Sequence, residues 1–397
     1  MQNRYIETCK PVAEVRSPVV SETVSGMIET IHAIGPEFAD RAAYYDENDA
    51  FVVENYQVLK AHKLFSAGIP TELGGGGLNH RELCTAIRTL AGYCGSTALA
   101  LSMHSHVVGT AVFSHARGKP GKKLLELVAG REAVMVSTGG NDWLDSSGTM
   151  DKVDGGYRVN AHKPFASGSP AGDFLVTSAR YKDPEKGWTV LHFPISTRAP
   201  GVDIEDNWKT LGMRGTGSNT IVLEDAFVPD EAVTLRRPIG EFHAVWNVIV
   251  PIATPIIMAA YVGVAEAAAG IARKTARKRT GGETLPYLLG EMENALTVAQ
   301  IALESMQDIT DNYRFTPSLE NTNAILIRKT LVENAVIETA EKAVAAVGGA
   351  AYFRDQGLER LLRDVHASVF HPLPEKEQHR FTGRFVLGLD PVGISTD

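Results

Sequence analysis

Cysteine is scarce in this chain of 397 residues, which contains three copies, at Cys9, Cys84 and Cys94. Three thiols at these spacings form neither a disulfide framework nor a CxxC metal site. The chain also lacks an HExxH motif and a repeated Asp pattern, so we expect no bound metal ion. Free thiols are typical of a reducing compartment, and we therefore expect a cytoplasmic protein.

An excess of positive charge is also missing. The chain has 39 Lys and Arg against 47 Asp and Glu, which gives a net charge of −8. The single basic cluster spans residues 273–279. Because phosphate backbones are bound by concentrated basic surfaces, we expect no nucleic-acid partner.

Long hydrophobic runs are limited to one segment, residues 248–265. Its length is close to that of a membrane span, but it contains Pro251 and Pro255 and continues directly into a polar helical stretch. The N-terminus has no apolar region of the kind that marks a secretory signal. We therefore expect no membrane span, and interpret the segment as a helix buried on all sides, inside the chain or at an oligomer interface.

The composition is that of an ordinary globular protein, and the sequence period changes twice along the chain. Residues 1–131 have a helical period and form a predicted N-terminal helical domain. Residues 132–236 alternate apolar and polar positions in short runs, which predicts a middle β-domain of antiparallel strands. Residues 237–397 return to the helical period in long, Ala-rich segments, which predicts a four-helix-type bundle. The predicted fold class is α+β, mainly α.

The predicted helices share apolar residues at spacings of three and four positions. They span residues 20–45, 50–66, 79–94, 96–117, 120–129, 241–278, 284–313, 319–347, 356–367 and 376–388. Asn79 and Glu82 match a capping box at the start of one helix, and Asp154, Gly155 and Gly156 predict a turn between two strands. No GxGxxG motif follows a predicted strand, so a Rossmann nucleotide domain is not expected.

Four local motifs carry a resemblance to a known family. They are GYCGSTALALSMH, VSTGGNDW, GYRVNAHKPFASG and WKTLGMRGTGS followed by VLEDAFVP, at residues 92–104, 136–143, 156–168 and 208–229. In this order and at these distances, the motifs and the three-part organisation resemble the acyl-CoA dehydrogenase superfamily from about residue 20 to about residue 390. The resemblance implies a helical domain, a β-domain and a helical bundle around a flavin.

The resemblance also implies which residues contact the flavin. A flavin needs a flat slot, hydrogen bonds to its polar edge and an open face for the substrate. The matched positions on the flavin-contact strand and loop are Met135, Val136, Ser137, Thr138 and Asn141, with Phe165 beside the ring and Ser167 as a hydroxyl contact. Without the resemblance, the same residues read as ordinary strand ends and β-core.

Three further positions match the dinucleotide-binding part of the family. Gly348 and Gly349 resemble a Gly pair that lets the flavin dinucleotide of a neighbouring subunit approach closely. Arg279 lies near an adenosine-binding or pyrophosphate-binding Arg. The alternatives are a plain helix end and a solvated basic helix end. The family's usual Gln is Ala345 here, and the aromatic residue after the Arg is missing, so FMN stands as the alternative to FAD.

The catalytic base of the family's dehydrogenases is not at either of its usual places. One place, eight residues after Asp364, holds Pro372, and the other holds Ala253 and Thr254. The superfamily's reduced-flavin monooxygenases carry a His-containing turn in this region, and His371 is therefore the candidate acid–base residue. Its alternative is a structural His before Pro at a helix end.

Two carboxylates nearby, Glu375 and Glu377, are alternative bases if the loop is displaced. Each is equally explained as a charge that favours the next helix dipole. The other histidines carry less information. His104 and His106 are two positions apart and cannot share one helix face.

Three functions remain open at this point. The resemblance favours oxidation of an acyl-CoA-type thioester by flavin, with electrons passed to an electron-transfer protein. The alternative is a monooxygenase that oxidises a small molecule with O₂ and with reduced flavin from a flavin reductase. A catalytically inactive flavin-fold protein is the third. We also expect a homo-oligomer, a tetramer or at least a dimer, assembled through the C-terminal helices.

Overall fold

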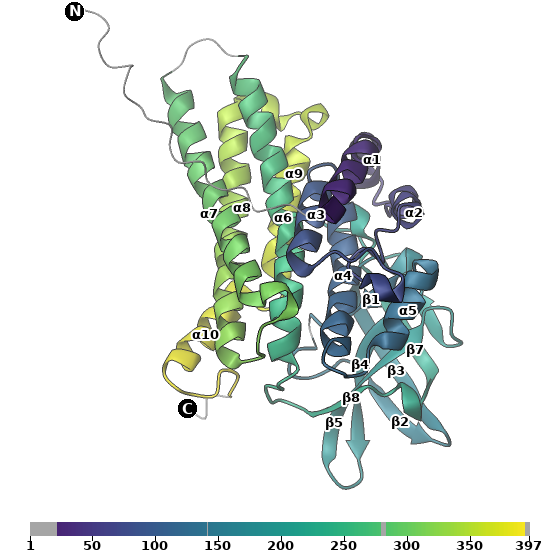
Figure 1. Cartoon of the computed structure of the whole chain (residues 1–397). Coiled ribbons are helices and arrows are strands. Elements are labelled where there is room, and N and C mark those ends of the chain that lie inside the picture. The colour runs from purple at the N-terminus through teal and green to yellow at the C-terminus, as the bar shows by residue number, and fades with distance from the viewer. Residues whose placement is uncertain (1–21, 141, 279–282, 394–397) are drawn as a thin grey trace, which may run out of the picture.

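The computed structural model describes residues 22–140, 142–278 and 283–393, and its elements follow the order helices, strands, helices (Figure 1). The first group of helices precedes the sheet and shares a core with the later helices. Its members are α1 (Glu22–Glu47), α2 (Val53–Ala61), α3 (His80–Ala91), α4 (Gly95–His115) and α5 (Lys122–Arg131). The capping box at α3 is confirmed, since the Asn79 side chain accepts the N–H of Glu82 and the Glu82 side chain accepts that of Asn79.

The helix predicted over 50–66 is shorter in the structure, where α2 ends at Ala61. Lys63 adopts a left-handed φ of 60°, which stops the helix, and the chain then turns into the segment before α3. A similar stop ends the helix predicted over 284–313 at Thr310, because Asp311 has a φ of 43°.

The middle part of the chain is one twisted sheet with the strand order β6-β7-β3-β2-β4-β5-β8. The strands are β1 (Met135–Ser137), β2 (Thr149–Val153), β3 (Gly156–Ala166), β4 (Phe174–Asp183), β5 (Gly187–Ser196), β6 (Val202–Ile204), β7 (Asn219–Pro229) and β8 (Leu235–Pro238). The predicted turn joins β2 to β3 in antiparallel register, with Gly155 at a φ of 72°. Two pairings differ from the expected pattern, since both β1 and β2 run parallel to β4.

The last part of the chain is the bundle. Its helices are α6 (Trp246–Ala276), α7 (Thr284–Thr310), α8 (Leu319–Val347), α9 (Leu358–Val365) and α10 (Glu375–Val386). Figure 1 shows the long helices α6, α7 and α8 running side by side, with α6 between them and the N-terminal helices. A short 3₁₀ helix, His366–Phe370, follows α9 and leads into the turn before α10.

Helix α6 contains the hydrophobic run noted in the sequence. It is long and apolar enough to cross a membrane, but 83% of its most apolar 18-residue window is buried inside the chain. Pro255 has no N–H for the carbonyl of Pro251, and that carbonyl instead accepts the Thr310 hydroxyl at 2.6 Å. The chain's own helices cover this run, which agrees with the first of the two interpretations given above, a helix buried inside the chain.

Candidate active site

Strand β1 brings the first predicted flavin residues together. Met135 and Val136 are buried, so they contribute backbone rather than exposed side chains. Thr138 is also buried, and its hydroxyl lies 2.6 Å from that of Thr177 on β4. Ser137 is half-buried, with its Oγ 2.9 Å from Nε2 of His106. Asn141 lies outside the described residues.

Two of the histidines of α4, His104 and His106, form hydrogen bonds with β1. His104 Nδ1 accepts the N–H of Met135 at 2.9 Å, and its Nε2–H donates to the carbonyl of Phe65 at 2.8 Å. Burial lowers the pKa values of His104 and His106 to about 4, so both are neutral near pH 7.

Sequence reasoning missed His106 because residues two apart on a helix point in different directions. Strand β1, beside α4, repeats its side-chain direction every second residue, so Met135 and Ser137 face the same side of the strand. The two histidines can therefore reach the same strand by different routes, one to backbone and one to a side chain. A pair of polar residues two apart beside a short strand is the signal that could have identified His106.

Phe165 occupies an unusual backbone conformation. Its φ is 60° at a register shift between β3 and β7, and 55% of the residue is exposed. The ring meets that of Trp208 edge to face, with 6.0 Å between centroids. An aromatic residue in the left-handed region costs on the order of 1–3 kcal/mol, and such strain is common at ligand sites. The exposed ring face at the end of β3 suits contact with a flat cofactor.

Ser167 follows at the same end of β3, in a chain of buried hydroxyls. Its Oγ lies 2.7 Å from that of Ser218, which lies 2.8 Å from the Thr216 hydroxyl. A chain of hydroxyls can reorient its protons to donate toward a neighbouring acceptor. This end of the sheet therefore presents both an aromatic surface and adjustable hydrogen-bond donors.

A buried ion pair fixes the loop after β1. Lys163 of β3 is fully buried, and its Nζ lies 2.7 Å from Asp142 Oδ2. It also donates to the carbonyl of Ser147 at 2.7 Å and to the Ser146 hydroxyl at 3.1 Å. The Lys163 ammonium group thus joins β3 to the loop after β1, because its hydrogen-bond acceptors all lie in that loop.

His371 lies in the turn between α9 and α10, against helix α6. Its Nε2 is 2.7 Å from the Tyr261 hydroxyl, with the two ring centroids 5.4 Å apart. A Cβ added at Gly140 would lie 3.8 Å from Cγ of Pro372, so the flavin-contact loop reaches this turn. The structure therefore brings His371 to the loop that the resemblance assigns to flavin.

The charge state of His371 differs from the sequence-based expectation. Burial lowers its pKa to about 3, and the nearby Lys329 ammonium and His106 act in the same direction. The imidazole is therefore neutral at pH 7 and does not titrate in the neutral range. This environment suits a hydrogen-bonding partner better than a strong base.

The two alternative carboxylates lie in the first turn of α10. Glu375 is half-buried, with its Oε1 3.7 Å from Nε2 of His379, and Glu377 is exposed. Both positions suit a charge at a helix N-terminus. On α8, Lys329 and Glu333 form a buried ion pair, and Lys329 contacts the His371 turn at the Leu373 carbonyl. Ala253 and Thr254, on α6, are buried and supply no carboxylate.

Gly348 and Gly349 lie apart from these residues. Gly348 ends α8 with a φ of 68° and a ψ of −152°, a conformation that suits glycine, and a Cβ at Gly349 would meet open space. The end of α8 is about 27 Å along its axis from Lys329, at about 1.5 Å per residue. The Gly pair and the His371 turn of one chain are therefore separate sites. Arg279 lies outside the described residues.

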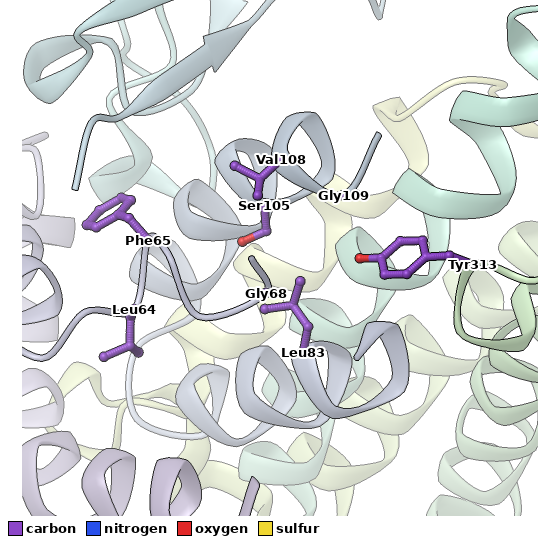
Figure 2. A pocket seen from close by; sticks show the side chains of 8 residues that line it. All are labelled: Leu64, Phe65, Gly68, Leu83, Ser105, Val108, Gly109 and Tyr313. Atoms are coloured by element: carbon purple, nitrogen blue, oxygen red, sulfur yellow. The ribbon is translucent and has the colours of Figure 1, made fainter. Parts of the chain in front are cut away.

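A narrow space between α3, α4 and the α7–α8 connection is shown in Figure 2. Leu64, Phe65, Gly68, Leu83, Ser105, Val108, Gly109 and Tyr313 line it. The Tyr313 hydroxyl is buried there without a hydrogen-bond partner. The space does not accommodate a water molecule, and it contains none of the predicted site residues. It is a dry packing gap and not a ligand pocket.

The side chains of β1 and of the end of β3 have the chemistry that an isoalloxazine ring needs. They supply hydroxyl donors at Ser137 and Ser167, an exposed aromatic face at Phe165 and a loop where a Cβ at Gly139 would meet nothing within 4 Å. A metal centre has no comparable donor set. Within the described part of the chain, no group of three His, Cys, Asp or Glu side chains is placed to bind an ion.

Comparisons with known proteins identify the family. Family models described as the N-terminal, middle and C-terminal domains of acyl-CoA dehydrogenase match residues 28–132, 137–226 and 256–374. A putative acyl-CoA dehydrogenase, YdbM, from Bacillus subtilis is 28% identical over 363 residues, which cover 87% of this chain and 92% of the relative.

Two further similar proteins have an amino sugar in their name or in their bound ligand. The amino sugar nitrososynthase RubN8 from Streptomyces rubradiris is 26% identical over 351 residues, covering 84% of this chain and 83% of the relative. The solved structure of KijD3 in complex with FMN and a dTDP-linked amino sugar has a TM-score of 0.84 and 24% identity, and covers 96% of this chain and 97% of that chain. The solved structure shares the fold of this chain, and the three family models, which together match more than half of it, show that the chain belongs to the acyl-CoA dehydrogenase family of flavin-dependent enzymes.

Proposed function

We propose that the protein is a reduced-flavin-dependent monooxygenase that oxidises a small molecule with O₂. The observation that carries this proposal is the His371 turn. Where the family's dehydrogenases place a carboxylate, this chain has Pro372 next to a neutral imidazole that is hydrogen-bonded to Tyr261. The proposal reverses the order of preference that the sequence alone suggested.

Dehydrogenation of a thioester requires a base strong enough to remove a proton from carbon. An imidazole with a pKa of about 3 is a weak base, so His371 is poorly suited to that step. The nearby carboxylate of Glu333 is held by Lys329, which lowers its availability as a base. Oxygen transfer has a different requirement, because a neutral hydrogen-bonding group near the reacting oxygen is sufficient.

In the proposed enzyme, reduced flavin supplies the electrons that activate O₂. Ser137 and Ser167 bind and orient the ring through their hydroxyls, and Phe165 covers one part of it. His106 orients the Ser137 hydroxyl through their 2.9 Å contact. With Nε2 accepting the Tyr261 hydroxyl, the neutral His371 holds its proton at Nδ1, where it can donate a hydrogen bond. The nitrososynthase name of one relative supports an amine as the class of substrate to examine first.

The deciding experiment compares two reactions of the purified protein. We expect that protein supplied with reduced FMN or FAD consumes O₂ and transfers oxygen to amine substrates, as measured with ¹⁸O₂ and mass spectrometry. We expect no anaerobic bleaching of bound oxidised flavin by a panel of acyl-CoA thioesters. Anaerobic bleaching by any of these thioesters, with formation of the enoyl product, would contradict the proposal.

The role of His371 is tested by substitution. His371→Ala should reduce oxygen transfer on the order of 10²-fold while flavin affinity stays within twofold, the scale expected for loss of a hydrogen-bond donor at the reacting oxygen. The matched control is His379→Ala, an exposed His on α10 that should change neither quantity. Glu375→Gln and Glu377→Gln should also retain activity. Loss of activity in either Gln variant, with activity retained in His371→Ala, would identify a displaced carboxylate as the acid–base group.

We further propose that the chain works as a homo-oligomer and receives reduced flavin from a flavin reductase. Helix α6 is covered by the chain's own helices, but α7 and α8 carry exposed apolar side chains: Val298, Ile301 and Leu331 are 47–59% exposed. Apolar side chains gathered on neighbouring helices favour contact with another copy. A monomeric mass by light scattering would contradict this part of the proposal.

A further inference from the structure

The turn that carries His371 has few backbone hydrogen bonds of its own. Pro372 and Pro374 have no N–H to donate. The His371 N–H donates to Ser368 at 3.3 Å, and the Pro374 carbonyl accepts from Gln378 at 2.9 Å. Between these two points, the carbonyl of Leu373 is bound by a side chain from a distant helix.

That side chain is Lys329 of α8. Its Nζ donates to the Leu373 carbonyl at 3.0 Å and forms an ion pair with Glu333, one helical turn further on. The side chains of Lys329 and Glu333 are 0% and 2% exposed. The contact joins residues 44 positions apart and reaches the backbone two residues after His371.

A buried ion pair is weak support for stability by itself, because removing two charges from water is costly. Apolar residues of similar size often replace such a pair without loss of stability. The Leu373 contact gives this pair a use that an apolar pair could not serve, since it places a donor on a carbonyl in a proline-rich turn.

We propose that Lys329, held in place by Glu333, is the positioning residue that keeps His371 against Tyr261. The inference rests on the proposed function only for its effect on turnover. Glu333 sets the direction of the ammonium group, the ammonium group fixes the Leu373 carbonyl, and the fixed turn keeps the imidazole 2.7 Å from the Tyr261 hydroxyl. Neither Lys329 nor Glu333 touches the reacting atoms in this scheme.

The test uses the double variant Lys329→Met with Glu333→Leu, which removes both charges together and avoids an unpaired one. We expect it to fold, with the flavin affinity changed by less than twofold. Amide hydrogen exchange in residues 366–378 should become at least tenfold faster. The single variant Lys329→Arg keeps Glu333, a cation and hydrogen-bond donors, so its amide exchange in residues 366–378 should stay close to that of the wild-type protein. Lys342→Met is the matched control on α8, because that Lys pairs with Glu291 at the surface.

A second readout separates positioning from general damage. In the wild-type background the double variant should lower turnover at least tenfold, and in a His371→Ala background it should cause no further loss, because both changes act through one group. Unchanged exchange in residues 366–378 would overturn the inference, as would an equal loss of turnover in both backgrounds. If exchange accelerates but the wild-type protein transfers no oxygen, positioning is supported and the proposed function fails.

Discussion

Two fully buried lysines lie on opposite sides of the candidate site, and they are satisfied in different ways. Lys163 of the β-domain has Asp142, Ser146 and Ser147 as acceptors, all within one loop. Lys329 of the bundle has a carboxylate on its own helix and one carbonyl in a distant turn. The loop after β1 is therefore held by several local contacts, whereas the backbone of the His371 turn is bound by one side chain from a distant helix, and the His371 side chain by another. We expect damage on the first side to affect folding and flavin binding, and damage on the second to affect reactivity.

The largest expected effect comes from Lys163→Met. The change leaves the Asp142 carboxylate buried without its cation, and breaking one partner of a buried pair costs about 3–5 kcal/mol in the free energy of unfolding. Flavin affinity should fall together with stability, because the same loop is assigned to the cofactor. Urea unfolding and flavin titration measure the two effects.

The control for this change is Lys152→Met on β2. Lys152 pairs with Asp230, but both side chains are more than 40% exposed, so the cost should be less than about 1 kcal/mol. Equal losses in the two variants would contradict the distinction between a buried and an exposed pair.

Mild acid should give the next largest effect, and it acts on both sides of the site. His104 is bonded to β1 and His80 to the Ile252 carbonyl of α6, and burial lowers the pKa of each to about 4. The unfolded chain binds these protons near pH 6.5, so the stabilisation is complete above that pH and declines as the pH falls toward 4.

The expected size follows from about 1.4 kcal/mol per pH unit for each group. Asp364 acts in the opposite direction, because burial raises its pKa to about 6 and the folded state gains a proton first. His80, His104 and Asp364 alone should give a net loss of about 2–3 kcal/mol between pH 7 and pH 5. The lowered pKa values of His106 and His371 add to this loss, and urea unfolding measures the total. His104→Gln should remove part of this pH dependence. An unchanged profile in that variant would count against a neutral, buried His104.

The third prediction concerns the far end of the bundle. If Gly349 approaches the dinucleotide of a neighbouring subunit, Gly349→Val should weaken FAD binding about tenfold and leave FMN binding unchanged. A Cβ at this position meets no atom of its own chain, so stability should not change. Gly290→Val on α7, where a Cβ also meets nothing within 4 Å, is the control. Equal losses for FMN and FAD would contradict a role limited to the dinucleotide.

The smallest effect on stability is expected for Phe165→Gly. Glycine adopts a φ of 60° without strain, so the relief should offset the lost contact with Trp208, and the free energy of unfolding should change by less than about 1 kcal/mol. Flavin affinity should nevertheless fall. The matched change Phe227→Gly, at an exposed Phe in regular strand β7, should destabilise more. The opposite order of stabilities would argue against strain at Phe165.

The sequence by itself determined the succession of elements and the family to which the chain belongs. Apolar spacing and the Asn79 cap are local signals, which is why α3 begins where the sequence predicted. His371 was also identifiable, because its turn stands where the family places its base. These features depend on neighbours within a few positions of the chain or on a motif that can be matched along it.

Only the tertiary structure decided which groups surround His371 and in what charge state. Tyr261 is 110 positions from His371 along the chain. Lys329 donates a hydrogen bond to the carbonyl of Leu373, which is 44 positions away and two residues after His371. No local sequence pattern could show either contact. The low pKa of His371 results from its burial and from a cation on another helix. Long-range packing also explains the burial of α6, because helices from both ends of the chain cover its apolar run. Long-range packing thus determined the chemistry of residues that the sequence had already marked.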